Sequence, residues 1–317
     1  MTSPLAPPPA TSGPVLDDVR ALGPIDWSHW TAAAERLERA LPAGPDRDSR
    51  VHHLYLPVLF ACLAWLNRAA RRPLVVGVQA PQGAGKTTLV AHLVDLLAVA
   101  GLATVSVSVD DFYLTRAEQL AVAAAHPGNP YLEHRGYPGT HDVGLGAETL
   151  TALRQLGPDA AGREVRVPAY DKSAHGGRGD RAPEADWRRV RAPLEIVLVE
   201  GWMLGYTPAP DAALPDPRLA DPNQALAAYA VWYEQIDVWI VLRAIDPTSV
   251  LRWRVQAEEA MRAAGRPALD RAAIEDYIRR FLPAYRIWGG APAGVPPSRQ
   301  LTIWLDDARR AASTPRT

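Results

Sequence analysis

The sequence predicts an α/β protein with a doubly wound, mostly parallel sheet and a layer of helices before it. Short runs of apolar and β-branched residues, typical of strands buried on both faces, recur at least five times. Segments with helical periodicity lie between them, and strands that alternate with helices form parallel sheets. Two apolar helical segments precede the first of these strands.

The first 70 residues are expected to add helices and no chemistry. Residues 1–20 are predicted to form a disordered tail, because the first 14 are rich in Pro, Ala, Ser and Thr and lack the basic and apolar regions of a targeting peptide. Residues 27–41 have the apolar face of an amphipathic helix, and residues 51–69 read as a more buried second helix. The longest uncharged apolar run, 54–67, is too short to cross a bilayer.

Composition narrows the classes of partner. The formal net charge is −1, so no overall field favours nucleic acid or an anionic membrane, and neither partner is expected. Cys62 is the single cysteine, which suits a reducing, cytoplasmic setting, and its apolar neighbours indicate a buried structural thiol. We expect one domain over residues 21–310, with N-terminal helices at 21–70, a nucleotide- and substrate-binding core at 71–310, and a tail at 311–317.

Residues 74–88 carry the strongest chemical signal. An apolar strand leads into a glycine-containing turn, then Lys-Thr-Thr and a periodic apolar helix, which is the context of a phosphate-binding P-loop. Glycines let the backbone N–H groups turn inward to cradle phosphate oxygens, and the helix N-terminus adds positive charge. Lys86 would reach the β- and γ-phosphates of ATP, and the Thr87 hydroxyl would hold Mg²⁺. The predicted nucleotide-binding residues are Gln82, Gly83, Ala84, Gly85, Lys86, Thr87 and Thr88.

One position departs from the motif. Ala80 stands where G-x-x-x-x-G-K-[ST] expects glycine, and the turn survives this change if the position does not need a positive φ. The alternative is a glycine-rich strand–helix turn with a chance lysine. The agreement of strand, loop and helix favours the P-loop.

Two acidic positions follow buried strands. The strand at 103–109 runs into Asp110 and Asp111, and the strand at 194–201 carries Glu200 near its end, like a Walker B strand. Carboxyl ends of parallel strands meet at the ligand-binding edge, so these acids should lie near the P-loop. There a carboxylate can accept the proton of an attacking hydroxyl and help organise Mg²⁺. An acidic pair after a strand is equally typical of a helix N-cap.

Cationic loops lie between these strands. Residues 126–146 are rich in turn signals and contain Arg135 and His141. An extended segment at 165–172, in which Pro168 indicates an edge or irregular strand, leads into the glycine-rich loop 173–181. Lys172, Arg178 and Arg181 there can clamp an anionic substrate. Solvated loops and a surface ion-pair cluster are the alternatives.

Further strands are predicted at 236–242 and 301–305, and helices at 148–156, 250–264 and 274–285, with a tail from 306. The helix at 250–264 carries Arg252 and Arg254. In a phosphoryl-transfer enzyme such a helix can act as a lid that neutralises transition-state charge, although charges on this face are also typical of solvated surface.

Taken together, several stretches resemble the plant-type D-glycerate 3-kinase family, which is similar to the wider group of phosphoribulokinase, uridine kinase and pantothenate kinase. The stretches are 80–88, 108–115, 128–130, 135–136, 139–142, 170–174, 177–181, 200–205 and 261–265.

This resemblance implies a P-loop kinase fold and ATP- and Mg²⁺-dependent phosphorylation of the 3-hydroxyl of D-glycerate. It favours Asp110 over Asp111 as the base, Arg252 and Arg254 as lid residues, and Thr87, Asp110 and Glu200 around Mg²⁺. Glycerate itself does not follow from composition or spacing. The substrate residues that we expect are Asp111, Tyr113, Arg135, His141, Tyr170, Lys172, Arg178 and Arg181.

Two other functions stay open. A kinase of the same architecture could phosphorylate another small alcohol, such as a nucleoside, a sugar or a pantothenate-like compound. A nucleotide-binding regulatory protein would need no small substrate, and the combination of Asp110, Glu200 and the lid arginines argues against it. The oligomeric state does not follow from the sequence.

Overall fold

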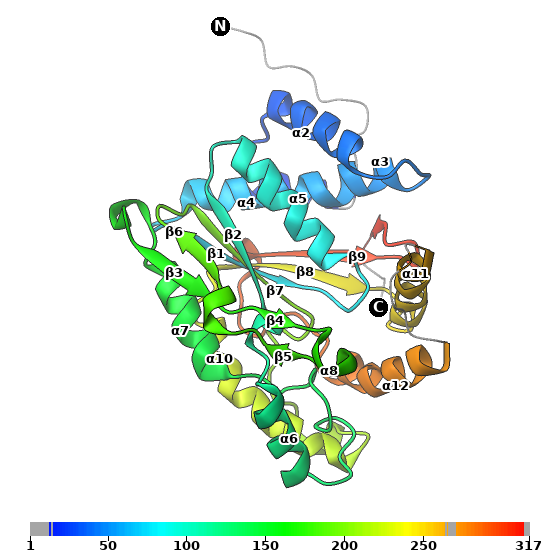
Figure 1. The fold of residues 1–317 in the computed structure, drawn as a ribbon. Helices are drawn as coiled ribbons and strands as arrows, with labels where there is room; N and C mark the ends of the chain where they lie inside the picture. Colours follow the sequence, from blue (N-terminus) through cyan, green and yellow to red (C-terminus); the bar gives the residue numbers. More distant parts are fainter. Residues whose placement is uncertain (1–12, 14, 264, 266–270, 314–317) are drawn as a thin grey trace, which may run out of the picture.

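A six-stranded sheet positions the rest of the molecule. The computed structural model describes residues 13, 15–263, 265 and 271–313, and its main sheet has the order β10-β9-β8-β1-β7-β2 (Figure 1). The strands are parallel except β10, which runs antiparallel to β9, so the predicted doubly wound, mostly parallel sheet is confirmed. Their bounds are β1 Leu74–Gln79, β2 Thr104–Ser108, β7 Ile196–Gly201, β8 Val238–Ala244, β9 Gln300–Leu305 and β10 Ala311–Ala312.

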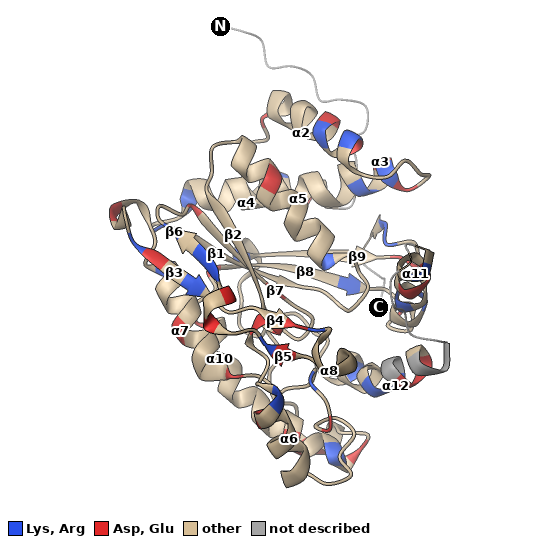
Figure 2. Ribbon diagram, in the orientation of Figure 1, with Lys and Arg blue, Asp and Glu red and all other residues tan. Residues whose placement is uncertain are grey.

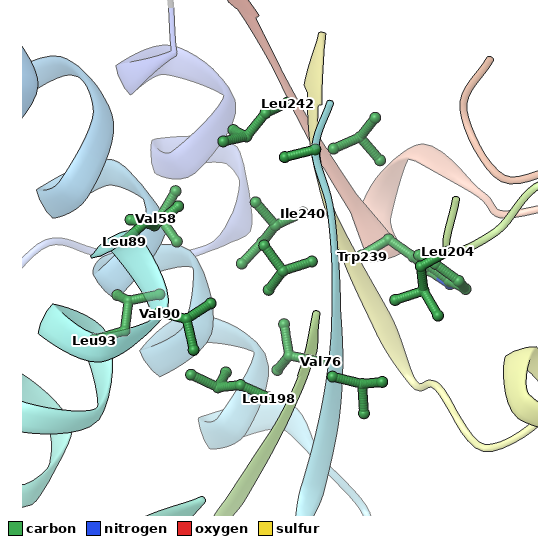
Figure 3. Close-up of a cluster of buried hydrophobic side chains, with 14 of the residues drawn as sticks. Val58, Val76, Leu89, Val90, Leu93, Leu198, Leu204, Trp239, Ile240 and Leu242 are labelled. Carbon is green, nitrogen blue, oxygen red and sulfur yellow. The ribbon is translucent and has the colours of Figure 1, made fainter. Parts of the chain in front are cut away.

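Both faces of this sheet are covered by helices, which explains why the inner strands are mostly apolar. Every residue of β1 and β7 is buried. On one face lie α4 (Leu56–Arg68) and α5 (Lys86–Val99), and Figure 3 shows Val58 and Leu89 facing Ile240 of the sheet. Leu204 and Trp239 lie on the opposite side in that view.

The other face packs against α7 (Val143–Arg154) and the short α10 (Ala230–Tyr233), with α12 (Arg271–Ile287) beyond them (Figure 1). Trp232 anchors this layer, because it is fully buried and its indole N–H donates to the Val143 carbonyl at 2.8 Å. The helix predicted at 148–156 begins earlier than expected, at Val143. Asp142 caps it, because its side chain accepts the Leu145 N–H.

The N-terminal helices form the predicted extra layer. They are α1 Leu16–Leu22, α2 Trp27–Ala40, α3 Arg47–Arg50 and a π-helical turn, Val51–Tyr55, that continues into α4. The helices expected at 27–41 and 51–69 are confirmed. The tail expected at 1–20 is wrong for its last residues, because Leu16 and Val19 of α1 are buried in the core. Residues 1–12 and 14 lie outside the described residues.

The remaining elements are short. Two small antiparallel strand pairs stand apart from the main sheet, one at each end of the segment 165–172 that was predicted to be an edge or irregular strand, and α6 was not expected. Their bounds are β3 Glu164–Val167 with β6 Arg188–Arg191, β4 Tyr170–Asp171 with β5 Asp180–Arg181, α6 Arg116–Ala125, α8 Ala174–Gly177 and α9 Ala220–Ala225. Short 3₁₀ turns span Val109–Phe112, Pro158–Ala160, Glu184–Asp186, Asp211–Ala213, Pro217–Leu219, Leu226–Tyr229 and Pro297–Arg299.

The C-terminal segment is not a simple tail. After β9 the chain turns and adds β10, in which Ala311 pairs with Leu305, so the tail expected from 306, or from 311, is wrong for these residues. Residues 314–317 lie outside the described part. The expected helix at 250–264 is α11 (Ser249–Ala263). Among the described helices, none has the length and apolar character needed to span a membrane.

Candidate active site

The turn between β1 and α5 has the geometry of a phosphate-binding loop. Gly83 and Gly85 have φ of +78° and +88°, a region that favours glycine, so these glycines bend the loop as predicted. Ala80 is not among the described residues with positive φ, and its N–H donates to the Gly201 carbonyl at 3.3 Å. Alanine therefore satisfies the position at which the motif expects glycine.

Lys86 and Glu200 meet at this edge of the sheet. In the sheet register Val78 pairs with Glu200, which sets the acid one strand away from the loop. The Lys86 Nζ lies 2.5 Å from the Glu200 Oε2, and both side chains are largely buried, at 17% and 8% exposure. The structure thus brings together the lysine and the acid that the sequence placed at the ends of two strands.

Asp110 completes this group of charges. Ser108, the last residue of β2, pairs with Glu200, so Asp110 emerges beside it. The Lys172 Nζ lies 2.6 Å from the Asp110 Oδ2. Burial raises the pKa of the Asp110 carboxyl, but the ammonium groups of Lys172 and Lys86 outweigh this effect and hold the pKa below its ordinary value. Asp110 is therefore ionised at neutral pH, and its role as a base stays a prediction.

Asp111 has a different role from its neighbour. Its Oδ2 accepts the Ser108 N–H at 3.0 Å, while the Ser108 hydroxyl accepts the Asp110 N–H at 3.2 Å, which is a capping box on the 3₁₀ turn. Burial raises the pKa of Asp111 to about 6. The capping interpretation of the acidic pair is confirmed for Asp111, and Asp110 faces the lysines. A direct substrate contact by Asp111 stays a prediction.

A histidine with aromatic neighbours lies beside Asp110. The His141 ring stacks on Tyr113 with centroids 4.4 Å apart, and Tyr170 meets Tyr113 edge-on at 5.2 Å. The Tyr229 hydroxyl lies 2.8 Å from the His141 Nδ1 and also accepts the Gly139 N–H at 3.1 Å.

Burial lowers the pKa of His141 to about 4, which keeps the imidazole neutral at physiological pH, although Asp110 pulls the other way. The Nε2 atom is buried and has no hydrogen-bond partner among the described residues. His141 is therefore a neutral, buried imidazole beside the acid.

Most cations of the predicted substrate loop are engaged within the protein. Arg135 donates to the carbonyl oxygens of Gly177 (3.0 Å), Arg178 and Lys172 (3.4 Å), which holds the glycine-rich loop in place. Arg178 contacts the His134 ring. Arg181 donates to the Asp142 carboxylate at 3.1 Å. The β4–β5 hairpin beside Lys172 carries both signs of charge (Figure 2). The ion-pair cluster that the sequence analysis named as an alternative is therefore present, and Lys172 itself pairs with Asp110.

Helix α11 packs directly on the P-loop. A Cβ at Gly83 would lie 2.8 Å from the Trp253 Cβ, so this contact requires glycine. The two predicted lid arginines flank Trp253. Arg252 is 56% exposed and pairs with Asp307, whereas Arg254 lies 2.5 Å from the buried Glu258. The structure therefore places Trp253 and the Arg254 backbone against the loop, and closure of either arginine over a phosphate stays a prediction.

Sequence reasoning missed two residues that hold the loop. The Arg309 Nε donates to the Gly83 carbonyl at 2.7 Å, and its Nη1 donates to the Gln256 side chain of α11 at the same distance. The Tyr285 hydroxyl of α12 accepts the Gln82 N–H at 3.2 Å. Arg309 lies in a segment read as a tail. The contact follows from the structure, because β9 pairs in parallel with β8 and the chain after a parallel strand emerges at the ligand-binding edge.

The oxygen donors at this edge suit Mg²⁺. Thr87 lies in the first turn of α5, and the Asp110 and Glu200 carboxylates face the same lysines. No group of three or more His, Cys, Asp or Glu within the described residues could hold a metal alone. Mg²⁺ is commonly held by one or two carboxylates together with substrate phosphates, so this sparse set fits. Nucleotide contacts by Gln82, Ala84, Thr87 and Thr88 stay predictions.

Comparisons with known proteins bear on this site. No family model matches the chain. It is 42% identical over 279 residues to the chloroplastic D-glycerate 3-kinase of Arabidopsis thaliana, covering 83% of this chain and 61% of that protein. It is 35% identical over 231 residues to mug58, an uncharacterized kinase of Schizosaccharomyces pombe, covering 69% of this chain and 82% of that protein.

A solved structure agrees with the sequence relatives. D-Glycerate 3-kinase from Cryptococcus neoformans superposes with a TM-score of 0.75 at 28% identity, covering 82% of this chain and 98% of that one. The chain spans about three fifths of the Arabidopsis relative and most of the two fungal proteins. With the P-loop and the sheet order described above, these matches establish that the chain belongs to the D-glycerate 3-kinase family of P-loop kinases.

Proposed function

We propose that this protein transfers the γ-phosphoryl group of ATP to the 3-hydroxyl of D-glycerate and yields 3-phosphoglycerate and ADP. The observation that carries the proposal is the pairing of Lys172 with Asp110 beside the P-loop lysine and Glu200. In this proposal Asp110 is the proton acceptor, Lys172 is the cation that attracts an acidic substrate, and both lie next to the phosphate-binding P-loop. The names of the Arabidopsis and Cryptococcus relatives support glycerate as the acceptor.

The proposed roles follow from position. Lys86 and the N–H groups of the loop hold the β- and γ-phosphates of ATP. The hydroxyl oxygen of the acceptor attacks the γ-phosphorus in line, and the bond from this phosphorus to the ADP oxygen breaks. Asp110 accepts the proton that the hydroxyl loses. Arg252 or Arg254 moves over the transferring phosphoryl group. Most of the rate enhancement then comes from positioning and charge stabilisation, without a covalent intermediate.

Thr87, with Asp110 or Glu200, would hold Mg²⁺. When bound, the ion neutralises charge on the β- and γ-phosphates. Because Lys86 is ion-paired with Glu200 in this structure, the lysine exchanges one anionic partner for another when phosphates arrive. The protein's own contribution is to hold Lys86 and Glu200 in a largely buried setting.

The proposal includes neither a nucleic-acid nor a membrane partner, on the basis of the net charge of −1. It also includes a cytoplasmic location, on the basis of the single, buried Cys62. The Arabidopsis relative is named as chloroplastic, so location is a point on which members of the family can differ.

The deciding experiment is ADP release by the purified protein with MgATP and D-glycerate, L-glycerate, uridine, pantothenate or no acceptor. D-glycerate-dependent turnover with 3-phosphoglycerate as product is the expected result. Turnover with another alcohol would keep the kinase and replace the substrate. Slow ATP hydrolysis that no acceptor changes would favour a nucleotide-binding regulatory protein.

A further inference from the structure

The sequence contains only two lysines, Lys86 and Lys172, and its other 32 cationic side chains are arginines. Both lysines pair with carboxylates of the candidate active site, Lys86 with Glu200 and Lys172 with Asp110. A lysine ammonium is a compact charge on a flexible stem, whereas an arginine forms a planar, directional fork. Both lysines are thus able to leave one carboxylate for another anion, such as a phosphate or a substrate carboxylate, without a large change of geometry.

The other cations near Asp110 have fixed partners. Arg135 donates to loop carbonyls, Arg178 contacts His134, and Arg181 bridges Asp142 and the Tyr113 carbonyl. Each of these contacts holds one loop against another, so releasing an arginine would loosen the site. Lys172 differs, because its side chain is 58% exposed and its one ion-pair partner among the described residues is Asp110.

The backbone beneath Lys172 is well anchored. Lys172 directly follows β4, whose Tyr170 and Asp171 pair with Arg181 and Asp180 of β5, and its own carbonyl accepts from Arg135 at 3.4 Å. Its ammonium can therefore move while its Cα stays in place.

We propose that Lys172 binds the carboxylate of the acceptor substrate, and that its transfer from Asp110 to this carboxylate uncovers the oxygen that accepts the hydroxyl proton. The inference rests on the proposed function, because it takes Asp110 as the base. In this structure the Lys172 Nζ lies 2.6 Å from the Asp110 Oδ2. An acidic acceptor offers the ammonium a replacement anion, so the ion pair exchanges instead of breaking.

This exchange lets Lys172 discriminate between acidic and neutral acceptors. A neutral alcohol that fits the same space provides no counter-ion, so it must separate Lys172 from Asp110 without compensation. The acceptor class is then a short hydroxy acid, whose carboxylate and reacting hydroxyl lie close enough to contact Lys172 and Asp110 together. A polyol of equal size, such as glycerol, is rejected although its hydroxyl is the same.

The kinetic test compares D-glycerate and glycerol as acceptors for the wild type and Lys172→Met. The variant should lower kcat/KM for D-glycerate by about 10²–10³-fold, as expected when a charged recognition contact is lost, and should lower it far less for glycerol. Arg189→Met is the matched control, because Arg189 is also 58% exposed and pairs with Glu164, away from the site. An equal loss for both acceptors in Lys172→Met would overturn the inference.

A second readout needs no turnover. With two lysines in the chain, acetylation by an amine-selective reagent can be followed at each by mass spectrometry. D-lactate, which has the carboxylate but no 3-hydroxyl, should slow acetylation of Lys172, whereas glycerol should not. Equal rates with and without D-lactate would refute the inference. If the wild type fails to phosphorylate D-glycerate, the proposed function is lost, and the protection by D-lactate still decides the role of Lys172.

Discussion

The Lys86 ammonium lies 2.5 Å from the Glu200 carboxylate, and the contact links the first turn of α5 to the end of β7. Because the pair is largely buried, Glu200 holds the lysine at the mouth of the P-loop. In the proposed function, phosphate oxygens compete with Glu200 for the same ammonium. The acid therefore both positions the lysine and becomes available to other ligands once the lysine has moved.

Glu200→Gln should lower kcat by about 10²-fold or more, because it removes one of the two charges expected to organise Mg²⁺ and leaves Lys86 without its counter-ion. The variant should also need more Mg²⁺ for half-maximal turnover. Steady-state kinetics over a Mg²⁺ titration measures both effects. Glu195→Gln is the control, because Glu195 precedes the same strand and pairs with Arg72 at its opposite end. Similar losses in the two variants would contradict a specific role for Glu200.

Asp110→Asn should reduce kcat by about 10²–10⁴-fold, the usual contribution of a general base, while the ATP dissociation constant changes little. Turnover and nucleotide binding, measured separately, check this expectation. A kcat within a few-fold of wild type would show that Asp110 is not the base.

Asp111→Ala should behave in the opposite way. It removes the bond from the Asp111 carboxylate to the Ser108 N–H, so the free energy of unfolding should fall by about 1 kcal/mol, as for other lost caps. Turnover should stay within a few-fold of wild type. Denaturant unfolding at pH 7 gives the stability. If Asp111→Ala abolished turnover in a folded protein, the assignment of the two acids would have to be exchanged.

The sequence predicts those parts of the site that depend on strand ends. A buried strand, glycines at the turn and a periodic helix specify the P-loop, and the parallel sheet brings Lys86, Asp110 and Glu200 to one edge. Ala80 could be accommodated for a reason stated in advance, the lack of a positive φ. These inferences succeed because burial and periodicity are local and the geometry of parallel strands is general.

Contacts between distant loops could not be predicted in the same way. Arg309 reaches the Gly83 carbonyl across 226 positions of sequence, and its segment has no periodicity that marks a role. Lys172 and Asp110 are 62 positions apart, so the cationic loop was recognised while its partner was not. Helix α6 was missed despite the Thr115–Glu118 capping box, which is a local signal and could have been used.

Arg309→Ala should weaken ATP binding and lower the free energy of unfolding by about 1–3 kcal/mol, because hydrogen bonds from a charged donor to the Gly83 carbonyl and the Gln256 amide are lost. Calorimetric titration with ATP and denaturant unfolding measure the two effects. Arg310→Ala is the control, because Arg310 lies in the same turn, is 51% exposed and pairs with Asp306. If both variants bound ATP equally well, Arg309 would have no role in holding the loop.

His141 should make the protein less stable in acid. The imidazole has an ordinary pKa of 6.5 and a pKa of about 4 when folded, because it is buried. Between these values the unfolded chain binds a proton that the folded chain does not, so the free energy of unfolding falls as pH decreases from 6.5 towards 4. The full contribution is about 3 kcal/mol.

His141→Gln removes this component and keeps an N–H donor, so its stability relative to wild type should rise by about 2–3 kcal/mol between pH 7 and pH 4.5. Urea unfolding at the two pH values measures it, with His29→Gln on α2 as the control for loss of an imidazole. A difference between wild type and His141→Gln that stays constant with pH would mean that His141 is not held neutral in the folded protein.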